Sequence, residues 1–477
     1  MSRGYDAIVV GAGPNGLAAA ITLQRHGLSV CLLEAKSSIG GGMRTQELTL
    51  PGFKHDVCSA VHPLLMSSPF FQSLPLKQYG LEFIQPSLPL AHPLEGEEAA
   101  FLSKSLEDTV ESLGIDGQRY LAWIQPLIRD WEGLAAGVLN PLDLSPRNLF
   151  RLSKFAIHSL RSAESIAGSF KTGKAKGVWA GLAGHSMLPF KELMAGTTGL
   201  ILAATAHTVG WPIVKGGSGT IAQAMGAYFQ DLGGVIQTDF EVQDMHALPA
   251  WKALLFDLGP QQILQIGGNH FNSHYSRALR KYRYGMGVFK MDWALHEPVP
   301  FKASVCQAAG TLHLGNAYAE IANAEQITAM GKVAKKPFVL FSQPSVFDSS
   351  RAPKGKHVAW GYCHVPHGAC VNMQEAIEEQ VERFAPGFKD CILARHSYNA
   401  QEMQAYNPNY IGGDINGGVL DLRQLFFRPT PSLSPYRTPA KGIYICSAST
   451  PPGGGVHGMC GYNAARQVIK EVFHLPI

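Results

Sequence analysis

The chain has 477 residues, of which 46% are hydrophobic and only 16% are charged. This length predicts two or more interleaved domains, and a charged fraction below the average of about 25% is compatible with a large core and an apolar substrate channel. The net charge of +4 is too small for a nucleic-acid-binding protein, so that class of partner is excluded.

The cysteines and the N-terminus indicate the compartment. None of the eight cysteines is spaced as CxxC, so the sequence signals neither a metal site nor a dithiol centre. The first strand begins near Tyr5, which leaves no room for a signal peptide. We therefore expect a cytoplasmic protein without a metal. The oligomeric state is left open.

The first predicted unit is a strand over 5–10, a helix ending near His26 and a second strand over 29–34. Between the first strand and the helix lies G-A-G-P-N-G, and Glu34 follows the third glycine by 18 residues. These are the parts of a Rossmann dinucleotide site, with glycines for the turn and close phosphate approach, and an acid for the ribose. The expected cofactor-binding residues here are Gly11, Gly13, Pro14, Asn15, Gly16, Glu34 and Ala35.

A second glycine block, Gly40–Gly42, follows the second strand and leads to an arginine. This pattern resembles the second FAD signature of glutathione-reductase-type flavoproteins and favours FAD over NAD. Arg44 is expected near the diphosphate or the flavin, where a guanidinium pairs well with anions. The predicted contacts are Gly41, Gly42, Arg44 and Thr45.

The middle of the chain predicts a change of architecture. Residues 85–210 read mostly as helices, with a mobile Ser/Gly/Lys-rich loop over 162–177 and an uncharged buried or substrate-facing helix over 194–209. A glycine loop at 216–219 opens another helix, and Val242, in a strand that follows, is expected to flank the adenine. Residues 286–295 and 337–365 alternate like antiparallel strands, and 373–385 form an amphipathic helix.

The last block is S-T-P-P-G-G-G-V-H-G at 449–458, between a strand over 442–448 and the final helix. The helix N-terminus is expected to point at flavin N1 and O2, where it stabilises the charge of reduction. His457 is either an extra donor there or a histidine packed in the turn. The expected contacts are Ser449, Gly455, Val456 and His457.

The three blocks in this order resemble the phytoene desaturase-like FAD oxidoreductases. The phrases at 287–295, 336–366 and 407–418 resemble a subgroup of that family, and the resemblance covers almost the whole chain. It implies an α/β fold with a Rossmann-type FAD domain of the glutathione-reductase or p-hydroxybenzoate-hydroxylase kind and a second α+β substrate domain with a helical insertion. The expected FAD domain is discontinuous, with the helical insertion over 85–210 as a substrate cap and the substrate domain over 286–430. The three segments of the expected FAD domain are residues 1–84, 211–285 and 431–477.

The expected activity is hydride transfer between a C–C bond of an apolar isoprenoid, polyene or lipid-like substrate and flavin N5, as in a desaturase, saturase or isomerase. Such a substrate is compatible with peripheral membrane contact. Candidate catalytic residues are Asp414 and His457, and Lys290 with Asp292 form a further i, i+2 pair. A turn-capping aspartate and a structural ion pair are the alternatives.

Two other functions remain open at this point. One is an amine oxidase, whose aromatic cage would draw on Tyr406, Tyr410 and Tyr462. The other is an FAD-loaded binding or assembly protein with little turnover. The sequence lacks a second dinucleotide motif, so NADH and NADPH are not expected as direct reductants.

Overall fold

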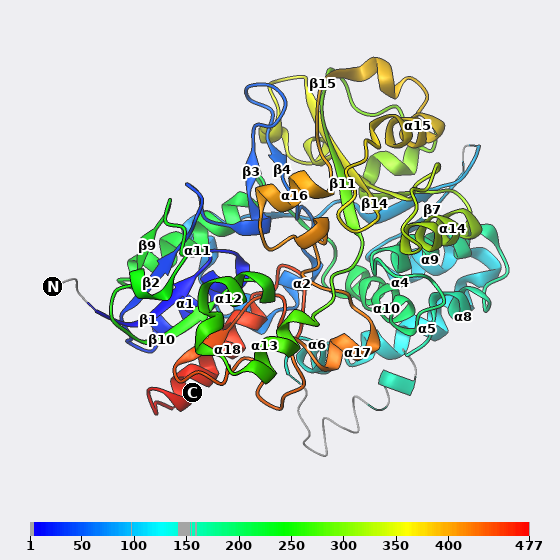
Figure 1. The fold of residues 1–477 in the computed structure, drawn as a ribbon. Coiled ribbons are helices and arrows are strands. Elements are labelled where there is room, and N and C mark those ends of the chain that lie inside the picture. Colours follow the sequence, from blue (N-terminus) through cyan, green and yellow to red (C-terminus); the bar gives the residue numbers. More distant parts are fainter. Residues whose placement is uncertain (1–3, 97, 142–152, 154, 158–159, 477) are drawn as a thin grey trace.

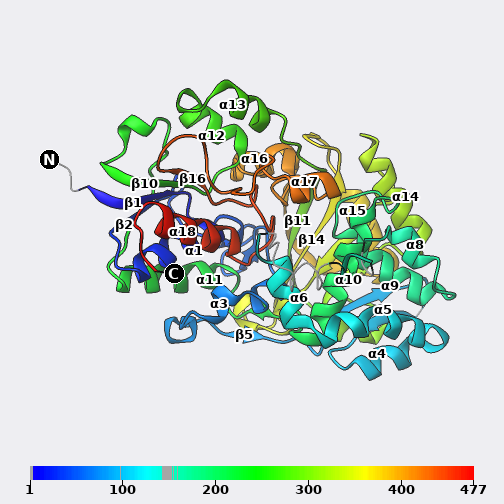
Figure 2. The ribbon, with the colours of Figure 1, turned by 90° about the horizontal axis from the view of Figure 1, so that it is seen from below.

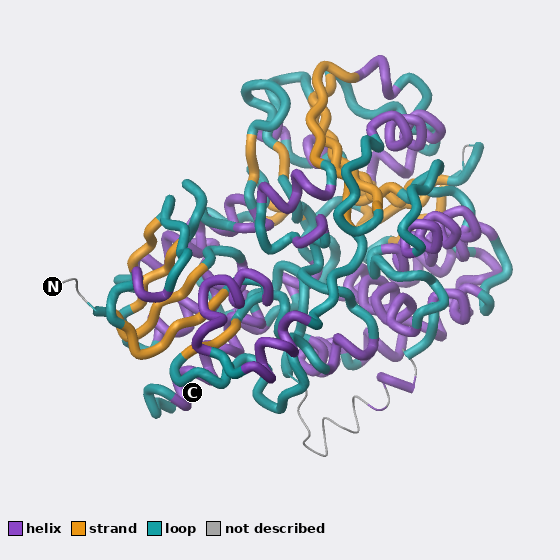
Figure 3. Tube along the Cα trace, in the orientation of Figure 1, coloured by secondary structure: helices purple, strands orange, loops and turns teal. Residues whose placement is uncertain are grey.

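Two large β-sheets lie at opposite sides of the molecule, with a group of helices beside the second (Figure 1). The computed structural model describes residues 4–96, 98–141, 153, 155–157 and 160–476. Figure 3 shows the same division, with strands at the two sides and helices gathered below the larger sheet.

The first sheet has five parallel strands in the order β16-β10-β1-β2-β9. Its strands are β1 (Tyr5–Val10), β2 (Val30–Leu33), β9 (Val235–Gln237), β10 (Trp251–Phe256) and β16 (Ile443–Ile445). They come from three distant parts of the chain, as the sequence blocks suggested. The carboxyl ends of β1, β2 and β10 therefore meet at one edge, where such sheets bind ligands.

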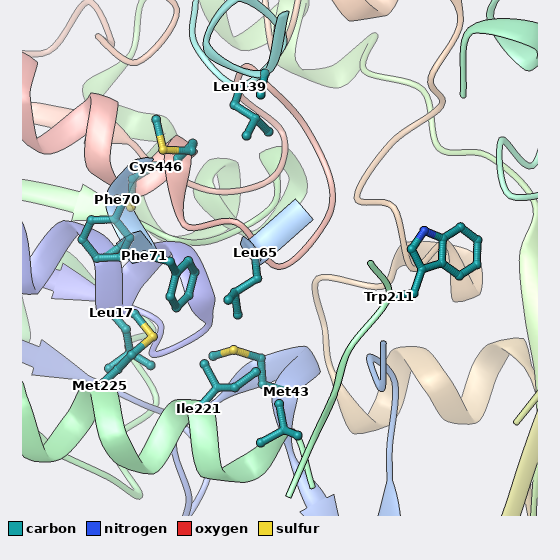
Figure 4. Close-up of a cluster of buried hydrophobic side chains, with 14 of the residues drawn as sticks. Leu17, Met43, Leu65, Phe70, Phe71, Leu139, Trp211, Ile221, Met225 and Cys446 are labelled. Carbon is teal, nitrogen blue, oxygen red and sulfur yellow. The ribbon is translucent and has the colours of Figure 1, made fainter. Parts of the chain in front are cut away.

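Helices cover both faces of this sheet because alternate strand residues are apolar on each side. One face, with Ala7 and Val9, packs on α1 (Pro14–Arg25), α11 (Gly219–Asp231) and α18 (Met459–Glu471). The other face, with Ile8 and Val10, packs on α12 (Pro260–Gly267) and α13 (Ser273–Arg280). Figure 2 shows the two groups on either side, and Figure 4 shows Leu17 of α1 beside Ile221 and Met225 of α11 in the first core.

The second sheet has seven strands in the order β15-β11-β14-β13-β12-β6-β7, antiparallel except for β12 and β6. Its strands are β6 (Leu88–Pro93), β7 (Ala99–Leu102), β11 (Gly287–Leu295), β12 (Ala309–Leu314), β13 (Val339–Ser342), β14 (His357–Val365) and β15 (Ile392–Tyr398). One face packs on α15 (Gln374–Phe384), and α9 (Gly173–Gly184) approaches the other.

The segment 85–210 differs from the expectation in two places. It begins with β6 and β7, which join the second sheet, so residues 88–102 are not helical. Residues 162–177, expected as a mobile loop, contain α8 (Ala163–Ala167) and the start of α9, because Ser162 and Thr172 act as helix N-caps. The other helices here are α4 (Leu106–Ser112), α5 (Gly117–Arg129), α6 (Trp131–Val138) and the buried α10 (Leu193–Thr208).

Shorter elements connect these layers. The helices are α2 (Pro63–Met66), α3 (Pro69–Gln72), α14 (Tyr318–Ala329), α16 (Ala400–Tyr406) and α17 (Leu422–Phe426), and the strands are β3 (Thr45–Gln46), β4 (His55–Asp56), β5 (Phe83–Ile84) and β8 (Ile213–Val214). Among the described residues, no helix has the length and apolarity needed to cross a membrane.

Candidate active site

A single cavity of about 640 Å³ runs from the carboxyl edge of the five-stranded sheet to the face of the seven-stranded sheet. Its size is typical of a small-molecule site. We call its two parts the dinucleotide end, around Gly11–Asn15 and Glu34, and the substrate end, around His185, Trp211 and Trp360.

The glycine loop at the dinucleotide end is packed so closely that larger residues do not fit. A Cβ on Gly16 would lie 1.8 Å from the carbonyl oxygen of Gly11, and one on Gly13 would lie 2.8 Å from Asp257 Oδ2. Gly11 has a φ of +99°, in the left-handed region that favours glycine. The loop thus packs tightly and brings the N-terminus of α1, with Pro14 and Asn15, to the cavity wall, where the positive end of the helix dipole favours an anion such as a diphosphate.

Glu34 lies at the end of β2, where its carboxylate is held by three donors. The backbone N–H of Ala12 donates to Oε2 at 2.9 Å, and the backbone N–H of Lys36 and Arg44 Nη2 both donate to Oε1 at 3.0 Å. A carboxylate accepts about four hydrogen bonds, so one position remains for a ribose hydroxyl. Residues 240–243 lie beside it, because the N–H of Phe240 donates to the carbonyl oxygen of Glu34, and this brings Val242 into the cavity wall.

Arg44 is buried and lines the cavity, but its guanidinium turns towards Glu34. Nε and Nη2 also donate to the carbonyl oxygen of Ser38, at 3.0 and 2.8 Å. The structure therefore places this charge at the carboxylate of Glu34, and the guanidinium carbon lies 5.7 Å from the ring centre of Tyr406.

Asp257 is a residue of this end that sequence reasoning missed. It follows β10 and lines the cavity, and its Oδ2 accepts a hydrogen bond of 2.8 Å from the N–H of Gly16. Burial raises the pKa of Asp257 well above its ordinary range, since a charged form would be desolvated beside Glu34. The sequence could have indicated Asp257 as a site residue, because it follows a buried parallel strand, and ligands bind at the carboxyl ends of such strands.

The C-terminal block reaches the same cavity. Ser449, Gly455 and Val456 line it, just before α18 begins with Gly458 as its N-cap. The other expected cofactor residues on the wall are Gly11, Gly13, Pro14, Asn15, Glu34, Ala35, Gly41, Gly42, Arg44 and Val242. Gly16, Thr45 and His457 do not line the cavity. Gly16 serves the packing of the loop, and Thr45 Oγ1 accepts from the N–H of Gly219 at 2.8 Å.

The hydrogen bonds of the two candidate catalytic residues favour the turn-capping alternative for Asp414 and the packed-turn alternative for His457. Neither Asp414 nor His457 lines the cavity. The carboxylate of Asp414 accepts from the backbone N–H groups of Gly285, Asn416 and Gly418 at 2.7, 2.9 and 3.1 Å, so it organises a turn.

His457 has both ring nitrogens bound to backbone. Nδ1 accepts from the N–H of Met459 at 3.0 Å, so the proton is on Nε2, which donates to the carbonyl oxygen of Gly453 at 3.2 Å. Burial lowers its pKa to about 4. It is the packed turn histidine, with no N–H left for a flavin.

Lys290 and Asp292 form an ion pair with a Nζ–Oδ2 distance of 2.6 Å, and both are buried. They lie on β11 opposite Tyr362 and Trp360 of β14, on the same sheet face as those rings. Neither residue lines the cavity. Each neutralises the charge of the other beside the cavity wall.

The substrate end is built from aromatic and aliphatic side chains of several elements. Its wall includes Val61, Leu202, Trp211, Leu340, Trp360 and Tyr362, together with Cys58, His185 and Thr311. Trp360 and Tyr362 have ring centres 6.1 Å apart and nearly parallel planes. The charged wall residues, Glu34, Lys36, Arg44, Glu241 and Asp257, all belong to the dinucleotide end.

The residues present fit FAD. The closely packed glycine loop supplies the diphosphate cradle, Glu34 has one free acceptor position, and the buried amide oxygen of Asn15 in the cavity wall has no hydrogen-bond partner in the described structure. The cavity wall also includes Gly455 and Val456, a few residues before the N-terminus of α18.

Comparison with known proteins agrees with this description. Residues 9–72 match the model of the NAD(P)-binding Rossmann-like domain. An oxidoreductase from Methanosarcina mazei has the same fold, with a TM-score of 0.66 at 16% identity over 98% of this chain and 100% of that one. The chain is 22% identical to the phytoene desaturase (lycopene-forming) of Pantoea ananas, over 95% of this chain and 96% of the desaturase.

The fold, the cavity and these relatives agree with a Rossmann-type oxidoreductase that is similar in sequence to the phytoene desaturases. Within that class, the chain is similar over nearly its full length to mouse pyridine nucleotide-disulfide oxidoreductase domain-containing protein 2. The two are 26% identical over 98% of this chain and 94% of the mouse protein.

Proposed function

We propose that this chain is an FAD-dependent oxidoreductase of the desaturase, saturase or isomerase type, acting on a C–C bond of an apolar isoprenoid, polyene or lipid-like substrate. The observation that carries the proposal is the division of the cavity: every charged wall residue belongs to the dinucleotide end, and the substrate end is aromatic and aliphatic. The wall there includes Leu202 of α10, the uncharged helix of the insertion.

When bound, FAD supplies N5 as the atom that exchanges a hydride with a substrate carbon, while a proton leaves the neighbouring carbon and a double bond forms. The chain holds the dinucleotide with the Gly11–Gly16 loop and Glu34. Its aromatic wall at Trp360 and Tyr362 orients the substrate and excludes water. Oxygen, a quinone or the product-forming substrate itself would take up the electrons in a net desaturation.

The same proposal divides the chain into an FAD domain of 1–84, 211–285 and 431–477, a cap of 85–210 and a substrate domain of 286–430. The strands β6 and β7 extend the substrate sheet from within the cap. The cap therefore contributes both a wall of the cavity and an edge of the sheet.

The bound FAD is proposed to be non-covalent. Covalent attachment through a thiol would need a cysteine at the cavity: Cys58 lines it, whereas Cys446 and Cys460 do not. Burial raises the pKa of the Cys58 thiol, which disfavours the nucleophilic thiolate. Denaturing the purified protein and filtering it tests this: FAD is expected in the filtrate, and flavin retained with the polypeptide, or FMN in the filtrate, would refute it.

The reaction class is tested by mixing the anaerobic holoprotein with isoprenoid alcohols, polyenes and amines while following flavin absorbance. Bleaching of the oxidised flavin by an isoprenoid or polyene, with a new C–C double bond in the product, is expected for a desaturase, and anaerobic reoxidation of the reduced flavin, with a lost double bond, is expected for a saturase. Bleaching by amines alone would support an amine oxidase, for which Tyr406 and Tyr410 line the cavity but Tyr462 does not. No bleaching or reoxidation by any class would support a binding or assembly protein.

Peripheral membrane contact is part of the proposal because apolar substrates partition into bilayers. Phe427 and Leu433, on the loop after α17, are 54% and 93% exposed and provide apolar side chains for such contact. Co-flotation with phosphatidylcholine vesicles, lost in a Phe427→Ser, Leu433→Ser double variant, is the expected result. Equal flotation of both proteins, or of neither, would contradict it.

A further inference from the structure

Two side chains in the wall of the substrate end carry polar atoms without a partner. Trp360 is 6% exposed and Thr311 is 3% exposed, and both line the cavity. Trp360 Nε1 and Thr311 Oγ1 are buried and make no hydrogen bond in the described structure. A buried donor left unsatisfied costs about 1–3 kcal/mol, so such groups usually have a function.

The sheet directs both groups towards the same space. Thr311 and His313 are two residues apart on β12, and His313 pairs with Leu340 of β13. Leu340 pairs with Tyr362 of β14, two residues from Trp360. Residues of one strand two apart, and residues paired across strands, share a face, so Thr311 and Trp360 stand on the cavity face two strands from each other.

The polar neighbour of the two residues and the fully buried tryptophans have partners. Ser342, on the strand between them, donates to the carbonyl oxygen of Gly310 at 2.7 Å and is satisfied. Trp211 also lines the cavity, but its Nε1 donates to Thr205 Oγ1 at 3.0 Å. Trp179 and Trp293 likewise donate, to the carbonyl oxygen of Ala163 and to Glu378 Oε1.

The chemistry of the two groups limits what they bind. An indole N–H is a donor only, so its partner must be an acceptor. The nearest charges on this face, Lys290 and Asp292, are paired with each other. His185 is held neutral, because burial lowers its pKa to about 3. An anion would therefore be desolvated here without a counter-charge, which is costly, whereas a neutral oxygen would not.

We propose that the substrate is an apolar molecule with one neutral oxygen function, a hydroxyl or carbonyl group, whose oxygen accepts a hydrogen bond from Trp360 Nε1, with Thr311 Oγ1 as the second polar contact of the subsite. The inference rests on the proposed function, since it adds an anchoring group to an apolar substrate. The hydrogen bond from Trp360 sets the orientation of the substrate, because the oxygen binds at the sheet and the hydrocarbon extends along the rest of the cavity.

The test compares two matched probes on the oxidised holoprotein: geraniol, and the hydrocarbon that lacks only its hydroxyl group. Binding is followed by the perturbation of the flavin spectrum, so turnover is not required. One hydrogen bond of about 1–1.5 kcal/mol predicts that geraniol binds roughly tenfold more tightly than the hydrocarbon.

Trp360→Phe, which keeps the ring and removes the N–H, is expected to abolish this preference and leave the hydrocarbon affinity within about twofold. Thr311→Val is expected to reduce the preference, and it provides a second variant if the first does not fold. Trp211→Phe is the matched control: its N–H is already engaged, so both probes should change by the same factor.

Equal affinity of the wild-type protein for the two probes would overturn the oxygen subsite and leave the proposed function standing. A preference that persists in both Trp360→Phe and Thr311→Val would also overturn it. If neither probe binds, the apolar-substrate proposal itself fails with it.

Discussion

The two ends of the cavity recognise their ligands by different means. At the dinucleotide end, backbone N–H groups, positive-φ glycines and a paired carboxylate, Glu34 with Arg44, surround the space. At the substrate end, side chains from distant strands and helices form an uncharged wall in which Thr311 and Trp360 lack partners. A backbone cradle tolerates little change of residue, whereas a side-chain wall can be rebuilt by substitution. We therefore expect the first end to specify the class of cofactor and the second to specify the substrate.

Gly16→Ala should have the largest effect, because it disrupts the backbone cradle itself. The added Cβ would lie 1.8 Å from the carbonyl oxygen of Gly11, in a loop that has no room to move. Purified protein without flavin, or no folded protein, is expected. The control is Gly173→Ala, where a Cβ meets nothing within 4 Å. Normal flavin content in Gly16→Ala would contradict the proposed role of the loop.

Glu34→Ala should weaken FAD binding by about 1.5–3 kcal/mol, roughly 10- to 100-fold, because it removes a charge-assisted acceptor. The same change leaves Arg44 without its carboxylate partner. Glu34→Gln, which keeps one oxygen acceptor, should lose less. The dissociation constant of FAD for the refolded apoproteins measures both, and unchanged affinity in Glu34→Ala with a normal melting temperature would count against ribose binding.

Buried histidines of the substrate end and of the seven-stranded sheet beside it should make the protein sensitive to mild acid. Burial lowers the pKa of His92 to about 4 and that of His185 to about 3, while an unfolded histidine titrates near 6.5. The unfolded chain thus binds protons that the folded chain does not, so stability is full above about pH 6.5 and falls as the pH falls towards 4.

At pH 5 the loss is about 2 kcal/mol for each such histidine. Denaturant unfolding at pH 7 and pH 5 measures it. His92→Gln should reduce the difference between the two pH values by about that amount, whatever it costs at pH 7. A stability that is the same at both pH values would show that these histidines are not buried in the neutral form.

The difference between the two ends also explains what could be predicted from the sequence. The glycine loop, Glu34 and the C-terminal block are local patterns whose spacing reflects one strand-turn-helix geometry, and most of these residues line the cavity. Asp257 was missed because its partner, the N–H of Gly16, is 241 residues away. Thr311 and Trp360 could not be predicted as a pair, because only the register of the three strands β12, β13 and β14 brings them onto one face of the sheet.

Asp414 and His457 show why the sequence left two alternatives open. A buried polar side chain near glycines suggests chemistry, but its hydrogen-bonding capacity here is taken up by neighbouring backbone N–H and carbonyl groups. Sequence spacing does not reveal whether a polar atom points at a ligand or at its own turn. The Ser/Gly/Lys-rich stretch at 162–177 was misread in a similar way, because Ser162 and Thr172 serve as N-caps of helices rather than as loop residues.

The last prediction, with no expected effect, concerns the second glycine loop, Gly216–Gly219. In a second dinucleotide site this loop would offer free N–H groups at the start of α11. Here the N–H of Ser218 donates to Asp56 Oδ1 and the N–H of Gly219 to Thr45 Oγ1, both at 2.8 Å. Asp56 is in turn paired with Arg351 at 2.8 Å. These N–H groups are therefore engaged within the protein, and residues 216–219, unlike the first glycine loop, do not line the cavity.

NADH and NADPH are accordingly expected not to reduce the bound flavin. Anaerobic mixing of either nucleotide with the holoprotein, followed by flavin absorbance, should show no more bleaching than buffer. Dithionite in the same cell provides the positive control, since it reduces the flavin chemically. Rapid bleaching by either nucleotide would mean that a nicotinamide reaches the flavin through the substrate end, and the uncharged wall would then have to be reinterpreted as a nucleotide site without a phosphate cradle.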